Sequence, residues 1–415
     1  MMRRIAYAGV VALTLGACSD RPTVTAPPES ESSLNRSDDS RKADDSRGGA
    51  VFAMTNQPTG NVIVAFRRSA DGTLTPAGTF PTGGLGSGGP PDPLRSQGSL
   101  ILTERGHGAE GGDSDDGDSD DGDSDGRDSR GKELLFAVNA GSNEISVFAV
   151  NGARLTLVCK VPSGGIRPTS LTVHRDLLYV LNAGSGTING FTVDRKGRLT
   201  PLAGSTRPIT GGAAADPAQV EFTPDGRLLV VTGKMTNVID TYEVDRRGQP
   251  SGPRANRSNG LTPFGFAFDN RGNLVVSEAF GGAPQQSALS SYRVSRDGAL
   301  TVISGSVRDF QTAACWVVIT DNGRYAYTSN TGSSSISSYR IRSNGALTLL
   351  ESVAAMTDPG SAPIDMSLSD GSRYLYVLNG ATGTINGFRV ERDGGLSRVA
   401  SAGGLPPNAQ GIAAK

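Results

Sequence analysis

Apolar residues in this chain occur in short runs of β-branched and aromatic residues, which are bounded by glycine, asparagine and aspartate. Residues 177–182 (LLYVLN) and 374–379 (YLYVLN) are typical of these runs. After residue 17, no long stretch places apolar residues at the i, i+3, i+4 and i+7 spacing of an amphipathic helix. Because short apolar runs between turn-forming residues are typical of strands, the pattern predicts an all-β fold.

The strand pattern repeats along the chain. Its clearest unit, residues 177–199, reappears at 374–396, and each copy has an aromatic residue in its second strand. Turns such as Asp71-Gly72 and Asn344-Gly345 follow this strand and supply the positive φ angles that tight hairpins need. Successive aromatic residues are 82, 43, 51, 50, 47 and 49 residues apart: Phe66, Phe148, Phe191, Tyr242, Tyr292, Tyr339 and Phe388.

A further short strand precedes six of the seven units, at 99–103, 170–174, 218–222, 264–268, 316–320 and 364–368. Four strands and about 48 residues per unit are the pattern of a propeller blade. The first unit has no such strand before it, and a matching strand occurs instead at 409–413 (AQGIA). We therefore expect residues 50–415 to form a seven-bladed β-propeller closed by its C-terminal strand, which removes the exposed sheet edges.

The N-terminal residues predict export. Arg3 and Arg4 precede an apolar run that is too short to span a bilayer, so residues 1–17 are interpreted as a signal peptide. The run ends at Cys18 and resembles the lipobox of bacterial lipoproteins, which implies a lipid anchor on Cys18; an ordinary signal peptide with a chance cysteine is the alternative. Ser19 after the cysteine then implies the outer membrane. We expect a protein of the bacterial cell envelope that is attached to the membrane through this lipid, with residues 18–49 as a disordered stalk.

One insertion, residues 106–131, interrupts the second unit with an acidic low-complexity tract. Asp121, Asp123, Asp125 and Gly126 match the start of a calcium loop, but its twelfth position is Lys132 instead of glutamate. We interpret the insertion as a disordered loop in preference to a calcium site, since like charges keep such a tract extended.

Composition excludes several classes of function. The balance of 40 basic and 41 acidic residues gives no field that attracts nucleic acid. The chain has two histidines and no Cys-x-x-Cys pair, so we expect no metal site. Cys159 and Cys315 lie in different units and are interpreted as buried free thiols. No Gly-x-Ser-x-Gly elbow or phosphate-binding loop occurs, and no cofactor is expected.

The repeated Tyr-Val-x-Asn, Thr-Ile-x-x-Phe and Asp-Gly-x-Leu segments resemble the lactonase family of seven-bladed propellers over residues 50–415. That family includes 6-phosphogluconolactonases and carboxymuconate cyclases, and the resemblance implies histidine, arginine and glutamate at the mouth of the central channel. The family's His-Pro-His segment corresponds here to Asp216-Pro217-Ala218, and its Pro-Arg-His segment to Pro263-Phe264-Gly265. Only the expected glutamate has a counterpart, Glu278.

Polar residues near the starts of the inner strands or in the adjoining loops are the candidate site. Glu278, Asp216 and Arg167 are the candidate catalytic residues, and Gln219, Gln311 and Asp365 are the candidate ligand-binding residues. Two functions follow from these residues, and a purely structural role in the envelope is the third hypothesis. The first is binding of a small molecule or a protein at the channel mouth with little or no catalysis, and the second is lactone hydrolysis or muconate-type cyclisation at a rearranged site.

Overall fold

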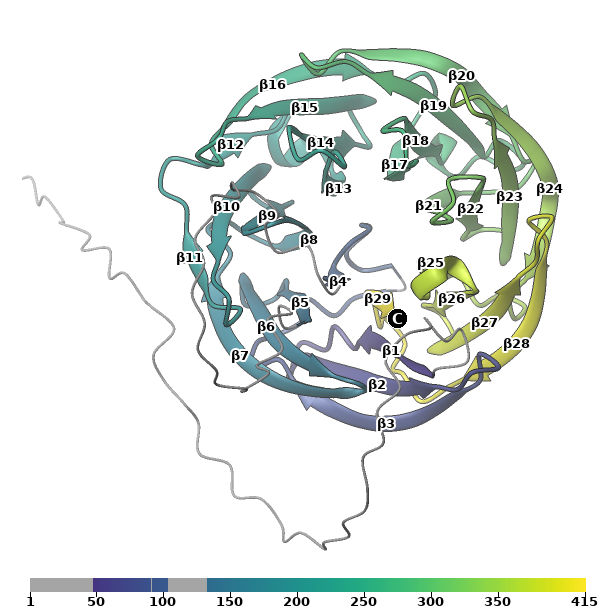
Figure 1. Cartoon of the computed structure of the whole chain (residues 1–415), viewed down its shortest axis with the longest axis horizontal. Coiled ribbons are helices and arrows are strands. Elements are labelled where there is room, and N and C mark those ends of the chain that lie inside the picture. The colour runs from purple at the N-terminus through teal and green to yellow at the C-terminus, as the bar shows by residue number, and fades with distance from the viewer. Residues whose placement is uncertain (1–47, 91, 104–132) are drawn as a thin grey trace, which may run out of the picture.

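The computed structural model describes residues 48–90, 92–103 and 133–415, which form a ring of seven antiparallel sheets around a central axis (Figure 1). The predicted seven-bladed propeller is confirmed. These residues contain no α-helix and only three short 3-10 turns, at Gly212–Ala215, Phe280–Gly282 and Asp370–Ser372. None of their helical turns is long or apolar enough to cross a membrane. The predicted signal peptide and the acidic insertion lie outside the described residues, as does the stalk apart from Gly48 and Gly49.

Each blade has an inner strand next to the axis and an outer strand at the rim. Blades 1 to 3 contain, from the inner strand outward, β29 (Ile412–Ala414), β1 (Gly49–Met54), β2 (Val62–Arg68) and β3 (Leu74–Pro81); β4 (Leu100–Leu102), β5 (Leu134–Asn139), β6 (Glu144–Asn151) and β7 (Arg154–Pro162); and β8 (Pro168–His174), β9 (Leu177–Asn182), β10 (Thr187–Val193) and an outer strand split into β11 (Leu199–Pro201) and β12 (Arg207–Pro208).

Blades 4 to 7 follow the same order. They contain β13 (Pro217–Phe222), β14 (Leu228–Gly233), β15 (Val238–Val244) and β16 (Pro250–Arg257); β17 (Pro263–Phe268), β18 (Leu274–Glu278), β19 (Ala288–Val294) and β20 (Leu300–Arg308); β21 (Ala314–Ile319), β22 (Tyr325–Asn330), β23 (Ser335–Ile341) and β24 (Leu347–Met356); and β25 (Pro363–Leu368), β26 (Tyr374–Asn379), β27 (Thr384–Val390) and β28 (Leu396–Ala402).

The repeated tyrosine of the second strand joins neighbouring blades. Tyr376 of blade 7 is fully buried and donates its hydroxyl to the carbonyl of Gly72, in the hairpin turn of blade 1, at 2.8 Å. Gly72 has a φ of 88°, and a Cβ there would lie 2.6 Å or less from the ring of Tyr374. Glycine is therefore needed both for the turn and for the close approach of the next blade. Tyr179 and Tyr327 make the equivalent bonds to Gly248 and Gly394.

An asparagine at the end of the second strand makes the same hydrogen bond in four of the seven blades. Asn139, Asn182, Asn330 and Asn379 are fully buried, and each side-chain amide donates to a side chain of the third strand: Ser146, Asn189, Ser337 and Asn386. In these four blades the asparagine side chain therefore ties the end of the second strand to the third strand.

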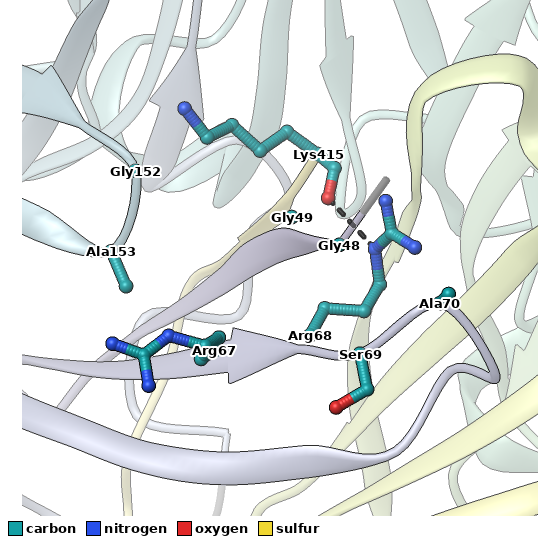
Figure 2. Close-up of a pocket in the computed structure, with 9 residues that line it drawn as sticks. All are labelled: Gly48, Gly49, Arg67, Arg68, Ser69, Ala70, Gly152, Ala153 and Lys415. Atoms are coloured by element: carbon teal, nitrogen blue, oxygen red, sulfur yellow. Dashed lines mark hydrogen bonds between the residues drawn. The ribbon is translucent and has the colours of Figure 1, made fainter. Parts of the chain in front are cut away.

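The ring closes where β29 pairs with β1, with Val51 opposite Ala414 and Ala53 opposite Ile412. Beside this seam lies a pocket of about 390 Å³ (Figure 2). There the Arg68 side chain reaches the C-terminal strand and donates Nε to the carbonyl of Lys415 at 2.9 Å, while Arg67 points away. The Lys415 ammonium forms a buried ion pair with Glu133 of blade 2. The C-terminal end of the chain thus contacts both blade 1 and blade 2.

The two described cysteines lie in different blades, as predicted. Cys159 of blade 2 and Cys315 of blade 6 are buried and form no disulfide within the part of the chain that the structure describes. His174 ends its inner strand and packs against Phe222, with ring centroids 5.7 Å apart. His107 lies outside the described residues.

Candidate functional site

The end of the ring at which the inner strands begin is here called the channel mouth. Arg167 and Asp216 each precede the proline that starts an inner strand, and both have left-handed φ angles, 55° and 46°. A register shift follows in β8 and in β13, directly after that proline. Such bulges re-aim side chains at strand ends. Here they accompany two candidate residues that face each other, with Arg167 Nη2 3.8 Å from Asp216 Oδ1.

Two more cations complete the cluster around Asp216. Arg95 Nη1 lies 2.9 Å from Asp216 Oδ2, and Lys234 Nζ lies 3.6 Å from the same oxygen. The Lys234 side chain is fully buried, whereas those of Arg95 and Arg167 are 55% and 39% exposed. The mouth therefore presents two guanidinium groups to solvent above a buried ammonium.

Lys234 occupies a site of unusual electrostatics. Burial lowers its pKa to about 8, although the carboxylates of Asp216 and Asp92 favour the charged form. Its Nζ donates to the carbonyl of Arg95 at 2.5 Å and lies 4.5 Å from the centroid of the Phe264 ring. Burial raises the pKa of Asp92 to about 7, against the lowering effect of Lys234. A buried ammonium held by a carbonyl and a ring face serves to fix the segment that carries Arg95.

That segment, Asp92–Gly98, precedes β4 and lies inside the ring (Figure 1). Ser96 is fully buried, and its carbonyl accepts hydrogen bonds from Trp316 Nε1 and Gln410 Nε2, both at 3.1 Å. Ser96 Oγ donates to the carbonyl of Thr169 at 2.8 Å. Blades 1, 3 and 6 thus bind one residue of the segment, which connects them inside the ring.

Comparisons with known proteins agree with the propeller fold. Residues 115–208 and 299–406 match the model of a family described as lactonase, seven-bladed β-propeller. The chain belongs to this lactonase family. No curated protein sequence matches significantly.

Solved structures show the same fold as this lactonase-family chain. A protein from Lactobacillus plantarum aligns with a TM-score of 0.66 at 18% identity over 88% of this chain and 99% of its own. A candidate 6-phosphogluconolactonase from Bacteroides uniformis gives 0.63 at 18% identity, over the same 88% and 99% of the two chains. The periplasmic gluconolactonase PpgL of Pseudomonas aeruginosa gives 0.61 at 14% identity, also over 88% and 99%.

Three positions depart from the pattern of the lactonase family, and all three are apolar and buried. Ala218 has no exposed surface, and Phe264 is 4% exposed and packs on Trp316 with ring centroids 5.1 Å apart. Gly265 has no room for a side chain, because a Cβ there would lie 2.2 Å from Gln97 Oε1 and 2.7 Å from the carbonyl oxygen of Cys315. None of these residues offers a proton donor, a proton acceptor or a cation to a lactone.

Glu278, the remaining counterpart of the family pattern, lies inside blade 5 at the position that asparagine occupies in four other blades. It is fully buried and accepts hydrogen bonds from Gly260 N (2.7 Å), Ser290 Oγ (2.5 Å) and Ser306 Oγ (2.6 Å). Burial raises its pKa, against these hydrogen bonds. These three hydrogen-bond partners belong to blade 5 and to the loop before it, so the carboxyl group of Glu278 is bound apart from the Asp216 cluster.

The candidate ligand-binding residues make bonds within the ring. Gln219 and Asp365 reach the backbone of the next inner strand, at Phe266 and Ile412 respectively. Burial raises the pKa of Asp365 well above its usual range. Gln311 bonds to Ser335 and Ser352 in the outer half of blade 6. The structure therefore brings together Arg167 and Asp216 from the predicted set and places the other four in structural contacts.

Sequence reasoning missed Arg95, Lys234 and Asp92. Lys234 directly follows the apolar strand LLVVTG, and this position is a signal that could have found it. Asp92 and Arg95 lie on either side of Pro93, just after a glycine-rich stretch. The segment has no periodicity and gives no local sign that it enters the ring.

Buried carboxyl groups predict how stability depends on pH. Burial raises the pKa of Glu221 to about 8, against a hydrogen bond from Gln219 Nε2, and raises that of Asp309 to about 6. Because these values exceed those of the unfolded chain, their stabilising contribution is complete at low pH and is lost as pH rises through the folded-state pKa. We expect the melting temperature to fall between about pH 5 and about pH 8.5.

The Glu221→Gln variant tests the cause, since glutamine keeps an acceptor for Gln219 but does not titrate. Its melting temperature should fall less over the same pH range, as measured by circular dichroism. A wild-type melting temperature that rises over this range would contradict the assignment.

Proposed function

We propose that this lactonase-family propeller binds an anionic ligand at the channel mouth and turns over lactones slowly or not at all. The observation that carries the proposal is the apolar replacement at Ala218, Phe264 and Gly265. Loss of a positioned acid or base costs about 10²–10⁴ in rate. Loss of an oxyanion donor costs about 10²–10³ more.

The ligand class is inferred from the exposed guanidinium groups of Arg95 and Arg167. Arg167 Nε is buried and has no hydrogen-bond partner among the described residues. Buried donors are normally paired, so an unpaired one at a mouth is a place for an acceptor from outside. Planar guanidinium groups bind carboxylate and phosphate well. A sugar acid or a sugar phosphate has the matching chemistry.

The test combines turnover with binding. Purified protein is assayed with gluconolactone, 6-phosphogluconolactone and carboxymuconolactone, and binding of gluconate and 6-phosphogluconate is measured by calorimetry. We expect turnover at background and binding that Arg95→Ala and Arg167→Ala weaken about tenfold each, as for a lost charged hydrogen bond. Arg257→Ala, an exposed arginine of β16, is the matched control and should bind normally. Equal binding of the anion by all variants would exclude the channel mouth as its binding site.

The second candidate function is lactone hydrolysis at a rearranged site. It is favoured by two of the aligned proteins, which are named as lactonases. In that case Asp216 acts as the base and Arg167 binds the developing oxyanion. Efficient turnover that Asp216→Asn abolishes, while its melting temperature stays within a few degrees, would establish this function in place of simple binding.

We also propose that the protein is anchored in the bacterial outer membrane through a lipid on Cys18, on the sequence evidence of residues 1–19. Several hydrocarbon chains on one residue hold a protein firmly at a membrane. Cys18→Ser should abolish metabolic labelling with a fatty acid and release the protein into the soluble envelope fraction. A parent protein that incorporates no fatty-acid label, together with a Cys18→Ser variant that stays membrane-bound, would exclude the lipid anchor.

A further inference from the structure

The inner strands of neighbouring blades are connected by side chains that bind the backbone of the next strand. Ser170 Oγ of blade 3 accepts from Val220 N of blade 4 at 3.1 Å. Gln219 of blade 4 uses both ends of its amide: Oε1 accepts from Phe266 N at 2.7 Å, and Nε2 donates to Phe266 O at 2.9 Å. These side chains satisfy the free edge of an inner strand, whose N–H and C=O groups would otherwise be unpaired.

Blade 5 cannot make the equivalent connection to blade 6. Its corresponding residue is Gly265, where the carbonyl of Cys315 approaches too closely for any side chain. Gln97 makes the connection in its place, from the segment that lies inside the ring. Its Oε1 accepts from Val317 N at 3.1 Å, and its Nε2 donates to Val317 O at 2.8 Å. Gln97 thus makes the same pair of side-chain hydrogen bonds to the backbone of Val317 that Gln219 makes to the backbone of Phe266.

The backbone of the same segment is bound along its length. Gln97 N donates to Ala218 O at 3.1 Å, and Gly98 O accepts from Leu171 N at 2.8 Å, which are bonds of the kind that join strands. At the other end, Gln410 Oε1 accepts from Leu94 N at 2.8 Å. Lys234 and Trp316 bind two further backbone carbonyls of the segment, those of Arg95 and Ser96. The bound groups of the segment are thus mainly its backbone amides and the side chain of Gln97.

We propose that the channel mouth is a binding site for an extended peptide and that residues 92–98 are its built-in occupant. Recognition follows the logic of strand addition, in which exposed strand edges bind backbone groups and a pocket selects one side chain. The space above Gly265 is that pocket, and glutamine is the residue it takes. This inference goes beyond the anionic ligand proposed for the channel mouth and does not depend on it.

The two buried thiols supply a readout. Cys315 adjoins the occupied site and is 6% exposed, and burial raises the pKa of its thiol to about 12. Buried, protonated thiols react slowly with disulfide reagents. Cys159 is equally buried in β7 of blade 2, where Sγ contacts Gly197 O, and reports on general unfolding.

The experiment weakens the binding of residues 92–98 by substitution and then adds the same segment as a free peptide. It uses the full chain with Cys18→Ser. In the Leu94→Gly/Gln97→Gly variant, we expect Cys315 to react with Ellman's reagent at least about tenfold faster than in the parent, since a local opening becomes accessible. A peptide of residues 92–98 (DPLRSQG) should restore protection. The same peptide with glycine for glutamine should not, and Cys159 should stay protected throughout.

Unchanged protection of Cys315 in the variant, or equal restoration by both peptides, would overturn the proposal. If the double variant does not fold, Gln97→Ala serves instead, because it keeps the backbone contacts of the segment. Cys315 should again react faster than in the parent, but by a smaller factor. Lactone turnover by the parent would overturn the proposed function without affecting these labelling results.

Discussion

Removal of residues 409–415 is expected to lower the melting temperature by about 10 °C or more and to cause aggregation. The deletion leaves β1 with a free edge, where Met54 N now bonds to Gly411 O, and it exposes the apolar side of blade 1. Loss of buried Ile412 alone costs about 2–5 kcal/mol. Each kcal/mol corresponds to about 1–2 °C in a domain of more than 300 residues, because the entropy of unfolding grows with chain length, and the deletion also removes the strand pairing and the contacts of Gln410 and Lys415.

Graded variants at one residue separate ring closure from general damage. Ile412→Val should cost about 0.5–1.5 kcal/mol and Ile412→Ala about 2–5 kcal/mol, and neither should aggregate, because the strand pairing remains. Thermal melts and light scattering measure both effects. A truncated protein that melts like the full-length chain would mean that the ring does not need its seventh inner strand.

Trp316→Ala is expected to lower the free energy of unfolding by about 3–5 kcal/mol, the range for removal of a large buried aromatic side chain. Trp316 is fully buried and is the only tryptophan of the chain. It packs on Phe264 and binds the carbonyl of Ser96, so the variant loses both the apolar contact and the hydrogen bond. Urea unfolding followed by circular dichroism measures the loss.

Trp316→Phe is the matched control for this prediction. It keeps an aromatic ring against Phe264 but leaves the Ser96 carbonyl with one donor fewer, so its unfolding free energy should fall by about 1–3 kcal/mol relative to the parent. An alanine variant as stable as the phenylalanine variant would show that the segment inside the ring, and not the aromatic packing, determines stability at this position.

The fold could be predicted because its determinants are local and repeated. The Asp-Gly and Asn-Gly turns, the Tyr-Val-x-Asn strands and the aromatic residues give the same signal seven times, so one weak copy does not change the count. The predicted 409–413 strand was also found at the seam, although its paired residues are Ile412–Ala414. The split outer strand of blade 3 was not predicted; proline at 201 and 208 lacks the N–H that a continuous ladder needs.

The site was only partly predictable, because it depends on contacts between residues that are distant in sequence. Arg167 and Asp216 were found through their shared place before an inner strand. Lys234 and Gln97 could not be assigned in the same way, since their roles arise from a single segment that crosses to blades 4 and 6. Glu278 shows the converse problem: it matches a family position, yet its neighbours Ser290 and Ser306 bind it as a structural group.

The pairing of Val51 with Ala414 has a consequence for the order in which the chain folds. Ribosomal synthesis runs from the N-terminus, so blade 1 emerges first and obtains its inner strand last. Contacts between residues far apart in sequence form slowly, whereas hairpins within a blade form early. A chain whose last residues are still inside the ribosome therefore cannot close its ring, even when its other strands have paired. The native state is complete only after Ile412–Ala414 have left the ribosome and reached β1.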